Sequence, residues 1–438
     1  MSNKIIKRIY VRGILTLLSP LLLGSGEDEN SDIDLLRDWE GRSFIPGSAL
    51  AGVLRHYLGE ILHSKDIDIV EEVFGRKPQK DQDSTQSLIY FYDAEIKNQP
   101  QIQIRDGVEI DNLTKTAKEK GKYDYEVLEA RNTFEFRTEL IIREKHNASL
   151  KKIENLLYLM LDALKNEKIR IGGKTRRGFG KVKLEDIKLL ILDMNEPEDR
   201  NKWIDFNWDF EGNSDIGVLN HNELGIKDIP VTTIKVKFSL PYSLIIKHYS
   251  AAPEVEDMEH LFSASKPVIP GTSWTGALRH AMENIGREIG KEKEIKDLIE
   301  KLFGYVDEES KKAKASRIYI EESIIKNEVS VSYTRNKVDR FTGGVVEGAL
   351  FEERPVFNNG DTEVHLNIHI KEGKDAEIGL LLLAMRDLWY GIQTIGGDAN
   401  IGRGILEGKE LIVNKTKINL ENREDKKYLK ALAEYLGS

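Results

Sequence analysis

The sequence predicts an α+β protein in which two copies of one module follow each other along the chain. The first observation is that the segment FIPGSALAGVLRH at residues 44–56 returns as VIPGTSWTGALRH at residues 268–280. The second is that further landmarks recur in the same order. The third is that strand and helix patterns alternate in the same way in both halves. Internal repetition on this scale indicates a duplicated domain.

Further matches extend the repeat along both halves. One of them aligns Asp111 with Asp339, and the last pair is a glycine-rich segment that closes each half. In chain order the matches are Phe74-Gly75 with Phe303-Gly304, SLIY (87–90) with SRIY (316–319), VEIDNLT (108–114) with NKVDRFT (336–342), and IGGKTRRGFG (171–180) with IGGDANIGRG (395–404).

Each copy is expected to begin with a strand and a helix. Alternating apolar and polar residues predict strands at 4–17 and 232–240. A helix should follow each Pro-Gly, because apolar side chains then recur at helical spacing. Ser48 or Thr272 is the expected N-cap of that helix.

The remaining elements complete the same order in each copy. The order strand, helix, strands, helix, strand predicts a ferredoxin-like, RRM-like αβ sandwich. Strands are expected at 88–92, 181–191, 317–320 and 405–413, and helices at 150–164 and 377–390.

These elements divide the chain into four parts. The segment between the copies is rich in Asn, Asp and Glu, and we expect Trp203 and Trp208 to anchor it on the surface. The predicted parts are a first module at 1–193, a linker at 194–228, a second module at 229–415 and a C-terminal helical tail at 416–438.

Composition argues against several classes of protein. No run of about 18 apolar residues occurs and the opening residues look like a basic strand, so we expect neither a membrane segment nor a signal peptide, and a cytoplasmic location. The absence of cysteine excludes disulfides, thiolate nucleophiles and Cys-ligated zinc. The formal net charge of −9 disfavours indiscriminate coating of nucleic acid, so nucleic-acid contact would need a local basic groove.

The glycine-rich segment of the first copy carries three cations, Lys174, Arg176 and Arg177. Glycines allow backbone N–H groups to approach a bulky ligand, and phosphate is the natural candidate. The alternative is a tight turn after a helix with solvated charges. In the second copy Asp398, Asn400 and Ile401 replace the cations, so that copy should bind differently or less strongly.

An Arg-His pair recurs in each Pro-Gly helix, as Arg55-His56 and Arg279-His280. The arginine could supplement the helix N-terminus as an anion site. Alternatively, the arginine pairs with a carboxylate and the histidine packs at a domain edge.

An acidic loop precedes each Pro-Gly, at residues 27–38 and 254–259. Carboxylates there would repel a phosphate chain unless they hold Mg²⁺ or Mn²⁺, which bridges carboxylate and phosphate oxygens. The alternative is a solvated surface loop. The predicted metal ligands are Asp32 and Asp34.

The order and spacing of these motifs, found twice, resemble the RAMP superfamily, specifically the backbone subunits of type III CRISPR complexes. The motifs are LLGSG at 22–26, the acidic stretch at 32–38, the Ile-Pro-Gly helix, Phe74-Gly75, Asp93-Ala94 and the closing glycine loop. The resemblance implies modules that grip guide RNA (crRNA), with a hairpin "thumb" that flips a guide base about every six nucleotides. The insertions at 97–130 and 325–350 look like such thumbs.

The resemblance also implies site residues. The family's catalytic aspartate falls on Asp32, with Asp34 as a nearby competitor, and on Asp257 in the second copy through a one-residue gap. The predicted RNA-binding residues are Ser48, Arg55, Lys174, Arg176, Arg177, Arg279, Lys337 and Arg340.

The implied reaction is metal-dependent cleavage of target RNA opposite each flipped base, with the 2′-hydroxyl of the RNA as nucleophile. The implied partners are crRNA, target RNA and other type III CRISPR subunits, and the fusion of two modules resembles subtype III-D.

Three alternatives stay open. The first is a metal-independent nuclease that processes precursor guide RNA with His56 or His280 as general base. The second is a non-catalytic scaffold. The third is a tandem RRM-like protein for cellular RNA, although KVKL at 181–184 lacks the stacking aromatics that such a protein needs.

Overall fold

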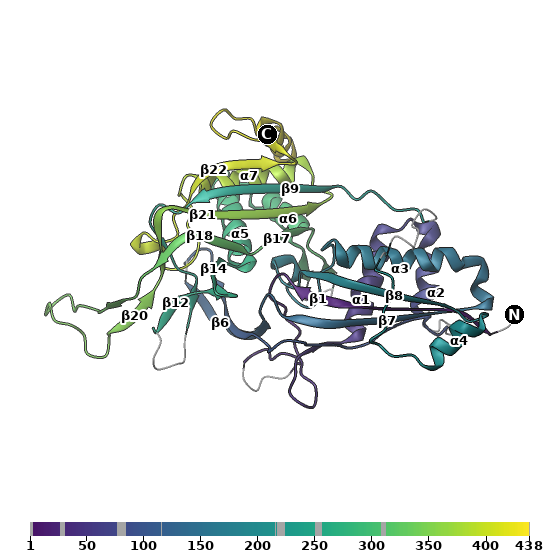
Figure 1. Cartoon of the computed structure of the whole chain (residues 1–438). Coiled ribbons are helices and arrows are strands. Elements are labelled where there is room, and N and C mark those ends of the chain that lie inside the picture. Colours follow the sequence, from purple (N-terminus) through teal and green to yellow (C-terminus); the bar gives the residue numbers. More distant parts are fainter. Residues whose placement is uncertain are drawn as a thin grey trace. The chain divides into compact units, whose positions relative to one another are not determined.

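The computed structural model describes residues 3–26, 31–76, 85–114, 116–214, 216, 224–249, 256–307 and 312–437, and the chain divides into two compact units (Figure 1). The second unit begins where the sequence places its second module. It also includes two short segments of the first module, a hairpin and part of a glycine loop. The first unit contains Met1–Ile104, Glu126–Thr175 and Phe179–Ile229, and the second contains Arg105–Tyr125, Arg176–Gly178 and Pro230–Ser438.

The first unit is built on a four-stranded antiparallel sheet in the order β3-β7-β1-β8. In the inner strand β1, Val11 pairs with Thr138 of β7 and Leu189 of β8. Because alternate side chains of a strand point to opposite faces, Ile9 and Val11 enter a core shared with three helices. The elements are β1 (Ile5–Leu17), β3 (Ile89–Phe91), β7 (Thr133–Arg143), β8 (Val182–Asp193), the small pair β2 (Phe44–Ile45) and β4 (Ala94–Glu95), and helices α1 (Gly47–Ile61), α2 (Ile67–Phe74) and α3 (Leu150–Lys165).

The linker covers the opposite face of this sheet. Phe206 stacks on Tyr10 with ring centroids 4.0 Å apart, and Trp208 meets Tyr92 edge-on at 5.2 Å. The Arg8 guanidinium lies 4.8 Å from the Trp203 ring. The two tryptophans anchor the segment, as the sequence predicts. It contains the short helix α4 (Pro197–Ile204).

The second unit repeats this order of elements around a larger sheet, β13-β14-β18-β21-β9-β22-β23, with β10 and β17 also paired to β21. Trp274 is fully buried and stacks on Phe238 at 6.0 Å. The strands are β9 (Val231–Ser239), β10 (Ser243–Leu244), β13 (Phe262–Ser263), β14 (Lys266–Ile269), β17 (Ile318–Ile320), β18 (Ser323–Ser330), β21 (Val356–Lys371), β22 (Glu407–Val413) and β23 (Thr416–Lys417), and the helices are α5 (Gly271–Glu288), α6 (Glu292–Phe303), α7 (Asp375–Trp389) and α8 (Lys426–Leu436).

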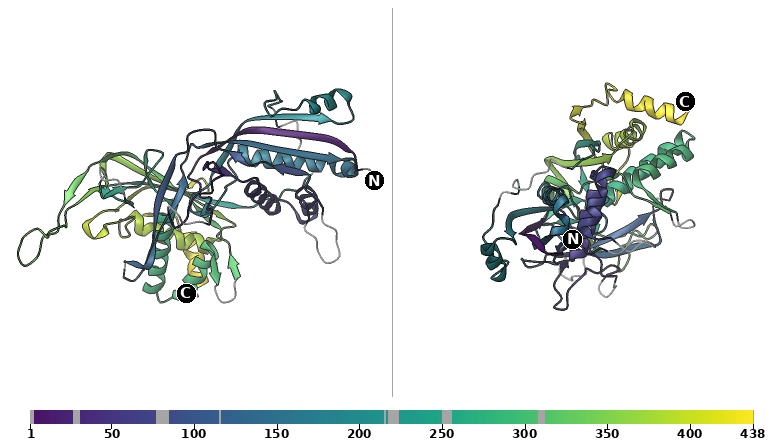
Figure 2. Two further views of the ribbon diagram at one scale, coloured as in Figure 1. Left: turned by 90° about the horizontal axis from the view of Figure 1, so that it is seen from below. Right: turned by 90° about the vertical axis from the view of Figure 1, so that its right-hand side faces the viewer.

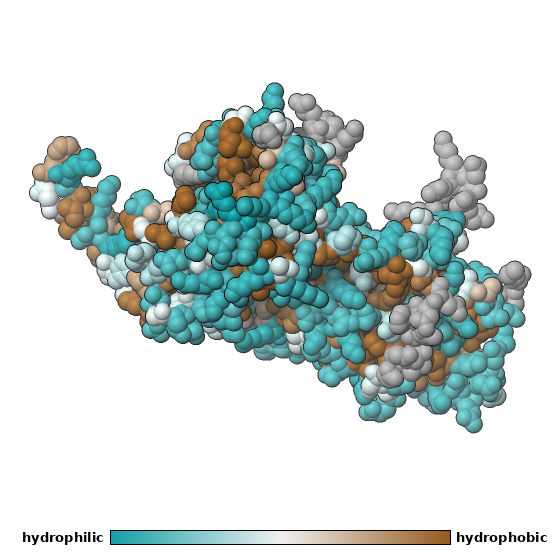
Figure 3. Space-filling model, turned by 90° about the horizontal axis from the view of Figure 1, so that it is seen from above, coloured by the Kyte–Doolittle hydropathy of each residue, from teal (hydrophilic) through white to brown (hydrophobic). Residues whose placement is uncertain are grey.

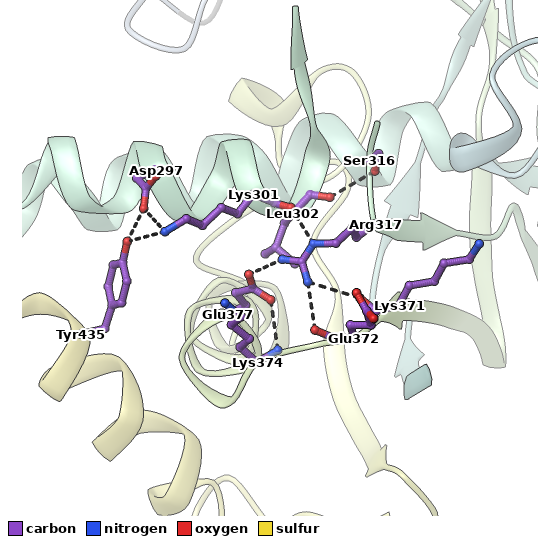
Figure 4. Close-up of polar contacts among 10 residues, drawn as sticks. All are labelled: Asp297, Lys301, Leu302, Ser316, Arg317, Lys371, Glu372, Lys374, Glu377 and Tyr435. Carbon is purple, nitrogen blue, oxygen red and sulfur yellow. Dashed lines mark hydrogen bonds and ion pairs between the residues drawn. The ribbon is translucent and has the colours of Figure 1, made fainter. Parts of the chain in front are cut away.

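The C-terminal helix α8 is part of the second unit's own core. Leu432 and Leu436 are buried, and a Cβ on Gly379 of α7 would lie 2.4 Å from the Tyr428 carbonyl oxygen of α8. In Figure 4, the Tyr435 hydroxyl contacts Asp297 and Lys301 of α6.

A second polar cluster in Figure 4 fixes the start of α7. The Arg317 guanidinium pairs with the fully buried carboxylate of Glu377 and donates to the Lys301 and Glu372 carbonyl oxygens at 3.0 and 2.9 Å. These contacts satisfy both charged groups, so we assign them a structural role.

A hairpin forms at each predicted insertion, and the second hairpin extends to Arg354, beyond the predicted bound of residue 350. In Figure 2 the loop between β19 and β20 extends from the body of the second unit. The hairpins are formed by β5 (Ile102–Ile110) with β6 (Ala117–Leu128), and by β19 (Tyr333–Arg335) with β20 (Phe351–Arg354). The remaining strands are β11 (Lys247–His248), β12 (Met258–His260), β15 (Tyr305–Asp307) and β16 (Lys312–Lys314). Within the described residues, no helix is both long and apolar enough to span a bilayer.

The predicted N-caps of the Pro-Gly helices are wrong. Pro46 and Pro270 are the N-cap residues, and neither helix has a side-chain cap hydrogen bond. Instead, the Gly47 N–H donates to the Asp93 carboxylate at 2.7 Å. A Cβ on Gly47 would lie 2.2 Å from the Phe91 carbonyl oxygen, so only glycine lets the helix begin this close to β3.

Candidate functional site

The glycine loops of the two modules share one backbone conformation. Lys174 and its counterpart Asp398 are both left-handed, with φ of 52° and 60°. A single 3₁₀ turn follows each of them, Thr175–Arg177 and Ala399–Ile401. The duplicated loops therefore keep their shape although their charges differ. Left-handed glycines also match in pairs, namely Gly172 with Gly396, Gly178 with Gly402, and Gly180 with Gly404.

The glycines close each loop on a neighbouring segment of its own module. The N–H groups of Gly173 and Gly180 donate to the Leu22 and Pro20 carbonyl oxygens at 2.8 and 2.7 Å. A Cβ on Gly172 would lie 2.3 Å from the Leu22 oxygen. The interpretation that these glycines bring backbone donors to a phosphate is therefore corrected, because two of the donors are already used. The Gly173 and Gly180 N–H groups are therefore not donors to a phosphate.

The cations of the first loop remain candidates for contact with a phosphate. Arg177 is exposed, whereas Lys174 and Arg176 are half-buried. Within the second unit, the Arg177 carbonyl oxygen lies 2.3 Å from the position of a Cβ on Gly271, the first residue of α5. Arg177 therefore belongs beside the N-terminus of α5, where a helix favours anions.

The second loop uses its charges internally. Asp398 pairs with Lys247 at 2.7 Å and with Arg403 at 3.3 Å. Arg403 is 2% exposed and binds the buried Glu353 through two nitrogens, at 2.6 and 3.2 Å. The loop positions that hold cations in the first copy present Asn400 and Ile401 to solvent. The charged groups of the second loop are therefore paired within its own module, and the expectation that this loop binds differently stays a prediction.

The predicted carboxylates of the acidic loops differ in their burial. Residues 27–30 and 254–255 of these loops lie outside the described part of the chain. Asp34 is 4% exposed and accepts hydrogen bonds from the Ser31 N–H and hydroxyl, both at 2.8 Å. Asp32 and Asp257 are exposed, and Asp257 also accepts from the Glu352 N–H at 2.9 Å. Asp34 therefore fixes the loop, while Asp32 faces solvent.

Both acidic loops run beside the base of their hairpin. The Ile33 carbonyl oxygen accepts from the Glu126 N–H at 3.0 Å, and Met258 pairs with Glu353 in a parallel bridge. The structure thus aligns Asp32 with Asp257 independently of the one-residue gap in the sequence alignment. The two exposed aspartates occupy equivalent places.

Sequence reasoning missed a buried glutamate at each hairpin base. Glu126 accepts from the Leu35 N–H at 3.0 Å and pairs with Arg37 at 2.9 Å. Glu353 pairs with Arg335 and Arg403. The sequence signal for these glutamates is an acidic residue near the end of each hairpin. The signal is weak, because the arginines that pair with the glutamates come from different segments in the two copies.

The carboxylates present limit what metal site can exist. Among the described residues, no group of three or more His, Asp or Glu side chains could hold a metal ion. The Oδ1 of Asp34 accepts two hydrogen bonds from Ser31, whereas Asp32 is exposed. Mg²⁺ keeps several waters and often uses one carboxylate with substrate phosphates. Among the described residues, Asp32 therefore fits Mg²⁺ or Mn²⁺ as a single carboxylate contact.

The Arg-His pairs lie away from the helix N-termini. Arg55 and His56 are exposed in the third turn of α1, beyond the first turn where the helix dipole acts. In α5 the Arg279 guanidinium lies 5.7 Å from the Phe303 ring centroid. Ser48 is exposed in the first turn of α1.

The tips of the two hairpins form the same turn. Asp111 accepts from the N–H groups of Leu113 and Thr114, as Asp339 does from Phe341 and Thr342. The predicted alignment of Asp111 with Asp339 is confirmed.

The two tips differ in their surroundings. The first tip touches α5, where Asn112 donates to the Glu283 carboxylate at 2.7 Å. In the second hairpin Lys337 and Arg340 are exposed.

Comparison with known proteins supports the duplication. The sequence model of the RAMP superfamily matches residues 14–183 and again 242–407, which together cover most of the chain. No curated protein matches the chain. The first match runs from within β1 to the start of β8, and the second runs from just after β9 to the start of β22. Each match contains the hairpin, the acidic loop and the glycine loop of its module. The chain therefore belongs to the RAMP superfamily of CRISPR-associated RNA-binding proteins, whose domain it carries twice.

Proposed function

We propose that the chain is a crRNA-binding backbone subunit of a type III CRISPR effector complex and that it cleaves target RNA paired with the guide. The observation that carries the proposal is the pair of exposed aspartates, Asp32 and Asp257, each held in an equivalent loop beside a hairpin base. Asp34 of the first loop differs from them, because it is buried.

The fold supports guide binding by surfaces other than the sheet face. The strand order β3-β7-β1-β8 is that of a ferredoxin-like, RRM-like module. An RRM stacks bases on the aromatics of its sheet. In the first unit the linker covers that face, and Phe206 and Trp208 pack against the rings of Tyr10 and Tyr92. This observation disfavours the tandem RRM alternative and leaves the loops and hairpins for RNA.

The proposed RNA contacts combine the basic loop and the second hairpin. Lys174, Arg176 and Arg177 would bind phosphates near the first hairpin base, and Lys337 and Arg340 would do so on the second hairpin. These cations lie at particular points of the surface, and Arg177, Lys337 and Arg340 are exposed. Local positive charge of this kind reconciles RNA binding with a net charge of −9.

Cleavage of RNA by its own 2′-hydroxyl depends more on how the RNA is positioned than on elaborate catalytic groups. The RNA 2′-hydroxyl loses its proton to water and attacks the adjacent phosphorus, and the bond to the 5′-oxygen breaks. That oxygen takes up a proton from water, so the products carry a 2′,3′-cyclic phosphate and a 5′-hydroxyl. A splayed base places that hydroxyl in line with the leaving oxygen. Mg²⁺ or Mn²⁺ bound by Asp32 would neutralise charge on the phosphate. The fixed loop holds the Asp32 carboxylate at one place relative to the hairpin base.

The test compares Asp32 with a paired carboxylate outside the acidic loop. Asp32→Asn in the assembled ribonucleoprotein should reduce cleavage at one position by a factor of about 100 or more, because a single group that stabilises the transition state has effects of this size. Asp199→Asn is the matched control. Asp199 is paired with Lys202 at 2.8 Å in the linker helix α4 and should leave cleavage unchanged.

The assay also separates the alternatives. EDTA should abolish target cleavage, whereas metal-independent processing of precursor guide RNA would survive it. Full guide binding without any target cleavage would contradict the nuclease and leave a scaffold.

A further inference from the structure

We propose that Trp39 stacks on an unpaired base of the target RNA beside the first cleavage position. This inference rests on the proposed function, because it names a substrate contact of the same site. It starts from an unusual exposure. Trp39 is 90% exposed, whereas Trp274 is fully buried, and Trp203 and Trp208 pack against other side chains.

The residue is displayed by a rigid turn. The Asp38 carboxylate accepts from the N–H groups of Glu40 and Arg42, both at 2.9 Å. The Arg42 side chain donates to the same carboxylate at 3.0 Å. These bonds, led by the Arg42 N–H, hold the pKa of Asp38 below its usual value, so the carboxylate stays charged and bonded at neutral pH. An indole on such a turn loses little conformational freedom when it binds a flat ligand.

The turn belongs to the same fixed segment as the candidate catalytic residue. Between Asp32 and Trp39 the chain is held at Leu35 and Arg37, both bonded to Glu126 at the hairpin base. An extended chain advances about 3.5 Å per residue, so the Cα atoms of Asp32 and Trp39 lie within about 25 Å of each other. That reach covers only a few nucleotides of a single strand. Trp39 can therefore contact RNA held at Asp32.

The surroundings of Trp39 favour a base over a protein partner. The core of a protein interface is a contiguous apolar patch. The neighbours of Trp39 in its turn are Asp38, Glu40 and Arg42, which are charged. A single exposed ring among charged groups suits one base, whose polar edges stay solvated while its face stacks.

In contrast to the single exposed ring of Trp39, the second unit has a cluster of exposed hydrophobic residues (Figure 3). There the protruding hairpin loop carries several hydrophobic residues together. Val338, Phe341, Val345 and Leu350 are all exposed. A protein partner would be expected at such a patch and not at the turn of Trp39.

The second module lacks this residue. Counting back from the shared Ile-Pro-Gly places Ser263, which is 7% exposed, opposite Trp39. The corresponding turn of the second module, at Ala264 and Ser265, is a tight left-handed one. The stacking contact is therefore expected at the first site alone, and the second site provides an internal control.

The experiment uses the assembled ribonucleoprotein and target RNAs that carry 2-aminopurine at successive positions around the Asp32-dependent cut. At one position the wild-type protein should quench the fluorescent base. Trp39→Ala should relieve that quenching and weaken target binding or slow the first cut by about 5- to 100-fold, the range measured for loss of one stacked base. Trp39→Phe should restore part of the effect. The Asp257-dependent cut should not change.

The outcomes separate this inference from the proposed function. If the wild type quenches one base but cuts nothing, the stacking contact stands and the nuclease fails. If both cuts occur and Trp39→Ala changes neither fluorescence nor the first cut, the stacking contact is wrong. Loss of subunits from the Trp39→Ala complex in native mass spectrometry, with base fluorescence unchanged, would assign Trp39 to a protein interface and also overturn it.

Discussion

At the residue scale, two carboxylates of one loop have opposite environments although they stand two positions apart. Asp34 is buried against Ser31 and Asp32 is exposed. The sequence shows two acidic residues of similar promise. Which of them turns inward depends on the Ser31 hydroxyl and N–H, and composition does not reveal that choice. The structure therefore separates a loop-fixing residue from a candidate catalytic one.

In the second module, the buried His260 lies at the end of the acidic loop and bonds to backbone groups on both sides of it. The Nδ1 of His260 accepts from the Ile246 N–H at 3.1 Å, and its Nε2 lies 3.0 Å from the Val268 carbonyl oxygen. These partners require the neutral ring. Complete burial lowers the pKa of His260 to about 4. The acidic loop of the second site, next to His260 in the chain, thus depends on an uncharged side chain.

We expect the second unit to lose stability as pH falls from about 6.5 to about 4. Above pH 6.5 the ring is neutral in both states, and between the two values only the unfolded state binds the proton. The loss should reach about 3 kcal/mol. Hydrogen exchange of residues 256–269 measures it. His260→Asn should flatten the pH dependence, and an unchanged slope in this variant would contradict the assignment.

At the element scale, the two glycine loops show that shape was retained while chemistry diverged. Gly180 and Gly404 are left-handed, and a Cβ on either would lie about 2 Å from a carbonyl oxygen of Ile171 or Ile395 (1.8 and 2.0 Å). In the first loop Phe179 fills the place that Arg403 takes in the second. The glycines therefore serve the closure of the loop, and the side chains between them set its charge.

Gly404→Ala should destabilise the second unit by about 2 to 5 kcal/mol, the sum of a left-handed alanine and a backbone overlap. Gly276→Ala is the matched control. It lies in α5, where an added Cβ would meet only open space, and should stabilise by about 0.5 to 1 kcal/mol. Chemical denaturation of both variants measures the difference. Equal stability of the two variants would refute the closing role.

Much of each module can be predicted from sequence because its elements have strong local patterns. The predicted strand at 4–17 and helix at 150–164 correspond to β1 and α3 within a few residues. The capping of α1 cannot be predicted, because its partner Asp93 lies on a segment far along the chain. The partners of the glycine loop cannot be predicted for a similar reason. The carbonyl groups that occupy its N–H donors belong to distant residues.

At the scale of the whole molecule, the duplicated sequence does not divide into two independent halves. The hairpin segment Arg105–Tyr125 belongs to the second unit, where the buried Arg105 pairs with Glu322 at 2.7 Å. The helical tail belongs there as well, through α7 and α6. A repeat reveals that two modules exist, but long-range pairs of this kind decide which segments each compact unit contains.

The most direct test of the account is the pattern of cuts in an end-labelled target RNA bound to the assembled complex with Mg²⁺. We predict two cuts about six nucleotides apart, because each module presents one exposed aspartate beside one hairpin. Asp32→Asn should remove one cut and Asp257→Asn the other. A pattern of cuts that neither substitution changes would contradict the assignment of the acidic loops, and no cuts at all would contradict the nuclease.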